Sequence, residues 1–327
     1  LLSDPKKIIN ESLKTLKLLN EQHEFNVKID THKKNTINKF RLKHDVKQAE
    51  MISSNNYKLN GLDKFLRIGN EVLNKNTSNE QILLSNNEIN SFLDYYKTTF
   101  VYESQKLPKY FINPDKNWKN IEDEYIGSSK RIIYIDDFLS TECLFELRKF
   151  CLLSKIWLID YKNKYLGAFN DRGFVSNIHL KIGNELKEKM PKIFSKHLLT
   201  RFWGFKYDTK LGKGINIHAD AAIENLNFWI TPNEFHKNKE GGGLKIYDIP
   251  APDDWHFNDY NNNPEKIYQF LNLNKPNLIK VPYKFNRAVL FNSAYFHETD
   301  EIDFEDKYEG QRINITYLFG ERKIKIQ

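Results

Sequence analysis

The sequence predicts an α+β fold, with an N-terminal α-helical region followed by a β-rich domain of the sandwich or jelly-roll type. Up to residue 107, apolar residues recur at helical spacing between breaks rich in Asn, Ser and Gly. After residue 201 come at least seven short strand-like segments with polar turns, which is typical of a sheet structure closed on itself. We therefore divide the chain into a helical region at 1–107, a linker at 108–129 and a β-rich domain at 130–327.

The helical region is predicted from four segments in which apolar residues recur every three or four positions. The first of them carries Ile9, Leu13 and Leu16 at this spacing. Ser85 and Glu88 are three positions apart at the start of the last segment, as in an N-terminal capping box. The four predicted helical segments are 5–22, 35–52, 61–75 and 85–100.

The remainder of the chain mixes strands and helices before it becomes almost entirely strand-like. "RIIYIDDF" predicts a short strand, and "STECLFELRKFCLLS" predicts a helix capped by its first serine. "IGNELKEKMPKIFSKHLL" predicts a second helix. The predicted strands that follow are 201–208, 214–220, 225–232, 242–249, 278–284, 287–297 and 312–322.

Composition limits the classes of partner and compartment. The net charge is +7, and most of the excess lies in the helical region. Acidic residues interleave with the basic ones, so a solvated helical surface is favoured over a nucleic-acid site. No apolar run is long enough to cross a membrane, and the first residues lack the apolar core of a signal peptide. Two cysteines without metal-ligand spacing, Cys143 and Cys151, suit a reducing compartment, so we expect a cytoplasmic protein.

The stretch "GINIHAD" contains a histidine and an aspartate two positions apart. In a strand, positions i and i+2 point to the same side, so His218 and Asp220 are expected to face one space. Such a pair suits a metal site better than an apolar core. A third ligand must come from a distant strand, and His297, at the end of the apolar run "AVLFNSAYF", is favoured over His256, which lies in a polar insert.

Two imidazoles and one carboxylate on one face of an octahedral ion form the facial triad of non-haem Fe(II) oxygenases. Three positions then stay open for a bidentate 2-oxo acid and O₂. The far carboxylate of such a cosubstrate needs an anchor, and a guanidinium binds a carboxylate bidentately. Arg312 opens the last predicted strand, which we expect to run beside the strand that ends in His297. Asn314 is two positions further on the same face.

On these residues the chain resembles the iron(II)/2-oxoglutarate-dependent oxygenases, most closely the prolyl-hydroxylase-like branch, over roughly residues 130–322. The resemblance rests on Tyr207, the pair His218 and Asp220, the distal His297, and Arg312. It implies a double-stranded β-helix core, Fe(II), 2-oxoglutarate and O₂ as cofactor and cosubstrates, and decarboxylation of 2-oxoglutarate to succinate coupled to hydroxylation of a substrate C–H bond.

A narrower resemblance is to oxygenase domains attached to tetratricopeptide-repeat proteins. It rests on "NFWITPNEFHKNKEGGGLKIYDIPAPDDW", "VPYKFNRAVLFNSAYFHETD", "RINITYLFGER" and "FRLKHDVKQAE". No tetratricopeptide repeat is legible in the sequence itself. We expect the N-terminal helices to serve as a recognition platform, or as a surface for a second copy or a repeat-domain partner.

Four further residues are candidates for contacts around the site. Tyr207 is interpreted either as a core tyrosine or as a hydrogen-bonding partner of the oxo acid. Asn227 is interpreted as a buried amide bonded to backbone or as a cosubstrate contact. Trp229, two positions along the same strand, and Arg172, in a loop flanking the site, are candidate substrate contacts.

Two alternatives compete with the hydroxylase. A radical halogenase needs a vacant metal position for halide, which the carboxylate of Asp220 fills. A non-catalytic jelly-roll module, which binds a ligand or a sugar, would not need the full set of ligands with Arg312. We therefore predict an enzyme that hydroxylates a peptide, a protein or a small molecule.

Overall fold

The computed structural model describes residues 4–22, 28–30, 33–161, 164–212 and 214–322. Its helices are α1 (Pro5–Gln22), α2 (Lys39–Ser54), α3 (Leu62–Lys75), α4 (Asn86–Lys97), α5 (Trp118–Gly127), α6 (Thr141–Leu153), α7 (Asn177–Lys189), α8 (Pro191–Phe194), α9 (Phe257–Asn261), α10 (Pro264–Asn274) and the 3₁₀ helix η1 (Asn233–Phe235). Its strands are β1 (Lys28–Asp30), β2 (Lys33–Asn38), β3 (Gln81–Leu83), β4 (Ile132–Ile135), β5 (Ile159–Tyr161), β6 (Tyr165–Phe169), β7 (Leu199–Tyr207), β8 (Lys210–Gly212), β9 (Glu224–Trp229), β10 (Leu244–Pro250), β11 (Leu278–Val281), β12 (Ala288–Asn292), β13 (Tyr295–Thr299), β14 (Ile302–Asp303) and β15 (Ile313–Phe319).

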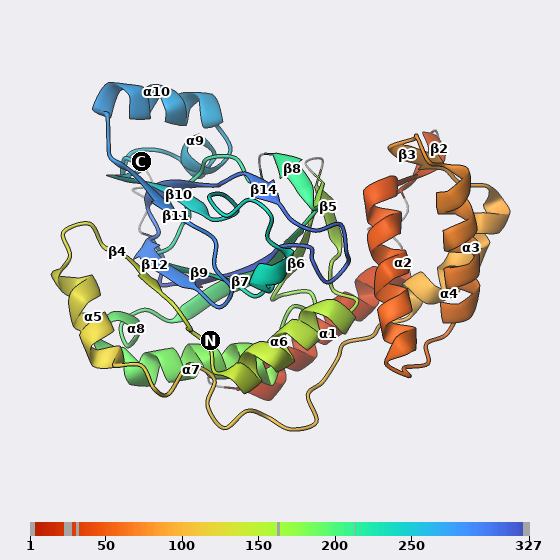
Figure 1. Cartoon of the computed structure of the whole chain (residues 1–327), viewed down its shortest axis with the longest axis horizontal. Coiled ribbons are helices and arrows are strands. Elements are labelled where there is room, and N and C mark those ends of the chain that lie inside the picture. The colour runs from red at the N-terminus through yellow and green to blue at the C-terminus, as the bar shows by residue number, and fades with distance from the viewer. Residues whose placement is uncertain (1–3, 23–27, 31–32, 162–163, 213, 323–327) are drawn as a thin grey trace.

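Two antiparallel sheets form the body of the molecule (Figure 1). The larger has seven strands in the order β4-β12-β9-β15-β7-β6-β5, and the smaller has three in the order β11-β10-β13. A cluster of buried side chains from both sheets, including Tyr207, Trp229, Ile246 and Phe291, joins them. The chain is therefore a mixed α and β fold built on a large antiparallel sheet.

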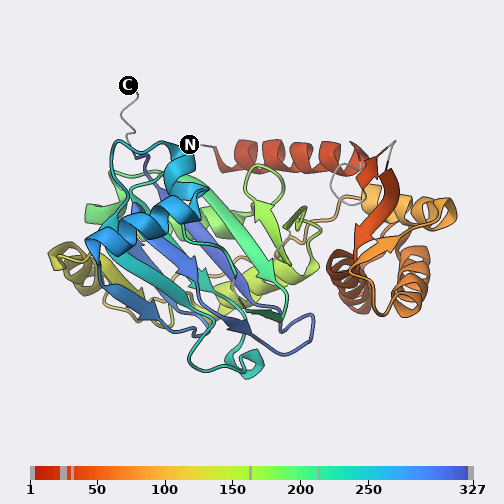
Figure 2. The same ribbon diagram turned by 90° about the horizontal axis from the view of Figure 1, so that it is seen from above.

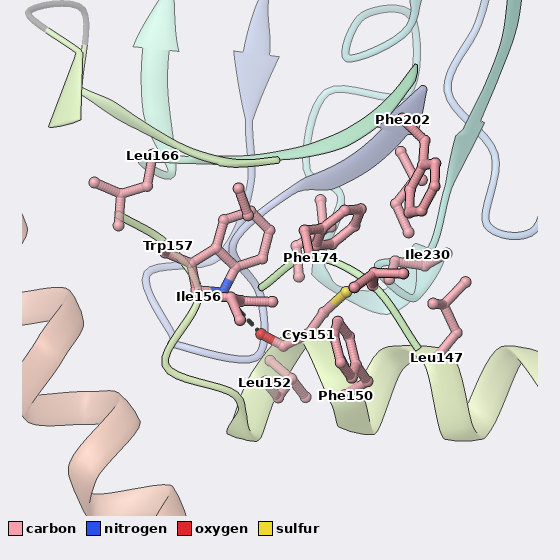
Figure 3. Close-up of a cluster of buried hydrophobic side chains, with 14 of the residues drawn as sticks. Leu147, Phe150, Cys151, Leu152, Ile156, Trp157, Leu166, Phe174, Phe202 and Ile230 are labelled. Atoms are coloured by element: carbon pink, nitrogen blue, oxygen red, sulfur yellow. Dashed lines mark hydrogen bonds between the residues drawn. The ribbon is translucent and has the colours of Figure 1, made fainter. Parts of the chain in front are cut away.

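Helices α6 and α7 cover the outer face of the larger sheet. The predicted cap of α6 is present, because the Oγ atom of Ser140 accepts a hydrogen bond from the backbone N–H of Cys143 at 3.2 Å. Phe150 and Cys151 of α6 point toward Phe174 and Phe202 (Figure 3). Burial raises the pKa of the Cys151 thiol to about 12, so this cysteine is an apolar core residue and not a reactive group.

The N-terminal helices α2, α3 and α4 gather at one end of the molecule, while α1 reaches back along the core (Figures 1 and 2). Ser85 and Glu88 form the predicted capping box at the start of α4. The prediction that the second helix begins at residue 35 is wrong. The side chain of Asn38 accepts from the N–H of Phe40 at 3.0 Å and caps α2 there, and the preceding residues form β2 in a small sheet with β1 and β3.

Buried hydrogen bonds join this helical end to the β-rich domain. The guanidinium of Arg41 pairs with Asp45 at 2.7 Å and also donates to the backbone carbonyl of Trp157. Two turns after Arg41 along α2, the amide of Gln48 donates to the carbonyl of Ser154 at 2.8 Å. Since both carbonyls lie in the segment that leads from α6 into β5, the helices are part of the packing of the sheet edge.

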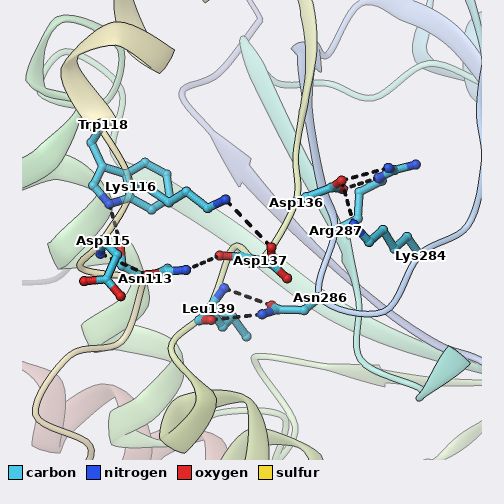
Figure 4. A network of polar contacts seen from close by, with 10 residues as sticks. All are labelled: Asn113, Asp115, Lys116, Trp118, Asp136, Asp137, Leu139, Lys284, Asn286 and Arg287. Carbon is cyan, nitrogen blue, oxygen red and sulfur yellow. Dashed lines mark hydrogen bonds and ion pairs between the residues drawn. The ribbon is translucent and has the colours of Figure 1, made fainter.

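The segment 108–129, predicted as a linker, carries α5 and packs against the β-rich domain (Figure 4). The indole N–H of Trp118 donates to the carbonyl of Asn113 at 2.8 Å, and the amide of Asn113 donates to the carbonyl of Asp137 at 2.9 Å.

No helix among the described residues is long and apolar enough to cross a membrane.

Asp136, at the end of β4, supports a pH-dependent part of the stability (Figure 4). Its hydrogen bond to Arg287, aided by Lys284 at 2.9 Å, holds the pKa of this carboxyl at about 2, below its ordinary value of 3.8. A depressed folded-state pKa stabilises the fold above the unfolded value, and this contribution is lost as the pH falls through the folded value. The free energy of unfolding in urea should therefore differ most between wild type and Asp136→Asn above pH 4. The difference should shrink toward pH 2, and a difference that stays constant would contradict this.

Candidate metal centre

Three potential metal ligands meet between the two sheets. His297 is on β13, and it pairs with His218 through two backbone hydrogen bonds of 3.0 and 2.8 Å in an isolated bridge. Asp220 lies with its carboxylate oxygens 3.9 Å from the Nε2 atom of His218 and 3.5 Å from that of His297. One ligand atom from each of the three residues lies within 4.8 Å of the others, so a single ion could contact all three.

Backbone carbonyls fix the orientation of both imidazoles. The Nδ1 atom of His218 lies 2.8 Å from the carbonyl oxygen of Asn216, and that of His297 lies 2.9 Å from the carbonyl oxygen of Tyr295. A carbonyl only accepts, so each Nδ1 carries the proton and each Nε2 keeps its lone pair. Both free lone pairs are on the side of Asp220, as in histidines that bind a metal.

The charge states also suit a cation. Burial lowers the pKa of His218 to about 4, and the neighbouring His297 adds to this effect. Burial alone would raise the pKa of Asp220, but the neighbouring imidazoles of His297 and His218 and a hydrogen bond from Asn225 lower it. At neutral pH the site therefore holds an unprotonated His218 and an ionised Asp220, the forms that ligate metals.

Asn225, on β9, holds the carboxylate of Asp220 in place. Its Nδ2 atom donates to Oδ2 of Asp220 at 2.8 Å, and its side chain is completely buried. Asn225 was not among the residues predicted from the sequence, although it shares a strand face with Asn227. We expect Asn225→Ala to weaken metal binding by about 10–100-fold, as for other contacts that orient a metal ligand.

Calorimetric titration of the metal-free protein with Co(II) measures this effect. Thr316→Ala is a suitable control, because Thr316 is equally buried beside Asn227 and has no contact with Asp220. Equal affinities of wild type and Asn225→Ala would show that Asp220 needs no support from Asn225.

The metal ligands open into a cavity with about 350 Å³ of non-atom space, open solvent included. Arg312 lies in its wall and is only 1% exposed. Its guanidinium donates to the carbonyl of Gly242 at 2.6 Å and to Oδ1 of Asn314 at 3.0 Å. The other residues that line the cavity are Trp203, Phe205, Tyr207, Ile215, Asn227, Leu244, Thr299, Asn314 and Thr316.

Arg312 is a buried cation whose partners are neutral. Within the part of the chain that the structure describes, no carboxylate lies within ion-pair distance of its guanidinium. The rings of Tyr207 and Trp229 lie 4.9 and 5.6 Å from it. An uncompensated buried charge is costly, so an anion in this cavity would be strongly favoured. The buried Oδ1 of Asn227 also lacks a hydrogen-bond partner among the described residues.

Two further candidates lie outside the cavity. Trp229 is completely buried beside Arg312 and Tyr283, and it does not line the cavity. Arg172 pairs with its neighbour Asp171 at 3.0 Å and also does not line it. His256 is exposed at the start of α9 and takes no part in the group of ligands.

Three details of the predicted geometry are wrong. The last strand, β15, pairs with β7 and β9, whereas the strand of His297, β13, pairs with β10 in the smaller sheet. The run predicted as one strand turns at 293–294 and supplies one strand to each sheet. The stretch 214–220 is an irregular segment with a single bridge. Arg312 therefore reaches the cavity from the sheet facing His297, and Gly242 and Gly243 supply carbonyls beside it.

No protein-family model and no curated protein matches this sequence. Solved structures do, including the non-heme alpha ketoglutarate dependent epimerase SnoN from nogalamycin biosynthesis, which is 11% identical over 64% of this chain and 87% of its own, with a TM-score of 0.44. A prolyl-4-hydroxylase of Pseudomonas putida is 10% identical over 63% of this chain and 100% of its own, with a TM-score of 0.39.

HygX from Streptomyces hygroscopicus, with nickel, 2-oxoglutarate and hygromycin B bound, is 10% identical over 61% of this chain and 86% of its own, with a TM-score of 0.41. A structure of SnoN contains Fe³⁺ and alpha ketoglutarate. Two of these structural neighbours, SnoN and HygX, thus have structures with a metal and 2-oxoglutarate bound. At such low identity, the function of this chain depends on its own residues.

Proposed function

We propose that this chain is an Fe(II)- and 2-oxoglutarate-dependent dioxygenase that hydroxylates a C–H bond, and that its two sheets form a double-stranded β-helix. The observation that carries the proposal is the joint presence, in one cavity, of a His-Asp-His group and a buried arginine whose charge is balanced by no carboxylate among the described residues. The first suits Fe(II). The second suits the carboxylate of an oxo acid.

Each residue has a separate task in this proposal. His218, Asp220 and His297 hold one face of the ion, and their backbone and Asn225 contacts keep that face rigid. Arg312, steadied by Asn314, binds the far carboxylate of 2-oxoglutarate. When bound, iron and 2-oxoglutarate supply the oxidising chemistry with O₂.

Three other residues complete the surroundings of the cosubstrate. The Nδ2 atom of Asn227 is held by Thr316 at 2.9 Å, which leaves its Oδ1 facing the cavity as an acceptor. The ring of Tyr207 packs on the guanidinium of Arg312 and excludes water from it. Since displaced water strengthens the remaining charge contacts, the tyrosine is expected to tighten cosubstrate binding.

The alternatives differ from this proposal at identifiable residues. A halogenase is disfavoured because Asp220 already occupies the position that halide would need. A non-catalytic binding module would not need Arg312 beside a complete set of ligands. We retain as predictions a cytoplasmic location, a peptide, protein or small-molecule substrate, no nucleic-acid partner, and a dimer or repeat-domain contact through the N-terminal helices.

The test is Fe(II)-dependent formation of succinate from 2-oxoglutarate, with mass spectrometry of treated cell extract for products heavier by about 16 Da (one oxygen atom). Asp220→Ala serves as the matched control, because it removes one ligand and leaves the cavity open. We expect succinate and a hydroxylated product from wild type only. Metal and 2-oxoglutarate binding without succinate in any extract would favour the binding module.

A further inference from the structure

A wide groove leads from the surface to the metal ligands. It shares His218, Asp220, Trp203 and Phe205 with the cosubstrate cavity, and it encloses about 2030 Å³ of non-atom space that includes open solvent. The volume that water-sized molecules can enter is about 920 Å³, which is at the upper end of the roughly 300–1,000 Å³ of pockets for drug-sized ligands. The groove therefore has room for a substrate larger than one ring.

One wall of the groove is aromatic. Trp203 and Phe205 alternate along β7 and face the groove, while Phe169 and Tyr161 join them from β6 and β5. All four are partly exposed. Gly167 lets the rings pack closely, because a Cβ atom there would lie 3.0 Å from the rings of both Phe169 and Tyr161.

The opposite wall carries polar groups. The Nδ2 atom of Asn261 donates to the carbonyl of Ala219 at 2.9 Å, and that of Asn262 donates to Oδ1 of Asn258 at 3.0 Å. No described donor is paired with the Oδ1 atoms of Asn261 and Asn262, which are therefore available as acceptors.

Arg322 supplies a donor to the same groove. Its side chain is 9% exposed, and its Nη2 atom is bound by Asp253 at 3.1 Å and by the carbonyl of Ala251. The buried Nη1 atom has no hydrogen-bond partner in the described part of the chain. The groove thus presents donors, acceptors and aromatic faces within one surface.

These groups discriminate between classes of substrate. Phosphate oxygens only accept, so a nucleic-acid backbone would leave the amide oxygens without partners. An extended peptide usually binds through the free edge of a strand, but β7 and β6 are hydrogen-bonded on both sides, and the edge strand of this wall, β5, has only three residues. A hydroxyl both donates and accepts, and a sugar ring combines several hydroxyls with an apolar C–H face that packs on aromatic rings.

We propose that this groove binds a saccharide substrate of more than one ring. The inference rests on the proposed function for its chemistry, in which a C–H bond of the sugar is replaced by C–OH. One atom of O₂ enters that hydroxyl and the other enters succinate, as 2-oxoglutarate is oxidised and loses CO₂. Trp203 and Phe169 support the rings, and Arg322 with Asn261 binds their hydroxyls.

The test is binding of the Mn(II)-loaded protein with 2-oxoglutarate to an array of oligosaccharides of two to six rings, without O₂. We expect binding to a subset, with Trp203→Ala and Phe169→Ala each weakening it about tenfold or more and Trp203→Phe recovering most of it. Phe145→Ala is the matched control, because Phe145 is 63% exposed on α6 and does not line the groove. Metal and 2-oxoglutarate affinities of Phe169→Ala should equal those of wild type.

Binding to no oligosaccharide, or binding that neither aromatic substitution weakens, would overturn the inference. The proposed function is tested separately by the metal and 2-oxoglutarate affinities and by succinate formation. Intact cosubstrate binding without saccharide binding would refute the groove assignment alone. Saccharide binding without succinate formation would keep the groove assignment and refute the enzymatic function.

Discussion

Substitution of His297 by alanine is expected to abolish stoichiometric binding of Fe(II). The remaining pair, His218 and Asp220, cannot occupy one face of an octahedral ion alone, so the loss should exceed the roughly 10–100-fold effect of an orienting contact. The fold should persist, because His297 joins His218 through backbone atoms that alanine keeps. Anaerobic titration of the metal-free variant with Fe(II) measures the affinity, and near-UV circular dichroism verifies the packing.

His256→Ala is the matched control for this experiment. His256 was the competing candidate for the third ligand, and it is exposed at the start of α9. Its replacement should leave the metal content of the protein unchanged. Full metal content in His297→Ala together with loss in His256→Ala would reverse the assignment of the third ligand.

Replacement of Arg312 by alanine should weaken 2-oxoglutarate binding while the metal content stays unchanged. Truncating one partner of a buried, hydrogen-bonded charge pair costs about 2–5 kcal/mol, which corresponds to a roughly 30-fold to several-thousandfold loss of affinity. Arg312→Lys should recover only part of it, because an ammonium cannot form the bidentate fork. Calorimetric titration of the Mn(II)-loaded variants with 2-oxoglutarate measures these affinities without turnover.

Arg287→Ala is the control for charge. Arg287 is bound to Asp136 on the outer side of the fold and does not line the cavity. An unchanged affinity in Arg312→Ala, with a loss in Arg287→Ala or Arg322→Ala, would mean that another guanidinium holds the carboxylate.

The three metal ligands could be predicted from the sequence because short sequence patterns around them indicate their role. His218 and Asp220 are two positions apart, and their side chains meet even though the backbone there is no regular strand. His297 follows an apolar run, and such runs end where a strand meets the polar interior of the site. The capping box of α4 and the N-cap of α6 follow equally from short-range contacts.

The pairing of strands was not accessible in the same way. Apolar residues in β12 and β13 read as one run, because burial in the larger sheet and burial in the smaller sheet select the same residue types. The turn between them was therefore missed, and β15 was given the wrong neighbour. Asn225 contacts Asp220, and the carbonyl of Gly242 contacts Arg312. Both contacts join separate segments of the fold, so the spacing of residues along one strand does not reveal them.

The hydrogen bonds from Arg41 and Gln48 to the carbonyls of Trp157 and Ser154 have a consequence for how the polypeptide denatures. A fragment that begins at residue 108 would lack Arg41 and Gln48. The segment at the edge of its sheet would therefore lose the donors to the carbonyls of Trp157 and Ser154, and Trp157 would lose the helix that covers it. Such a fragment is expected to precipitate or to remain unfolded. The whole chain should instead unfold in one calorimetric transition, because neither the N-terminal helices nor the β-rich domain has a complete hydrophobic core without the other.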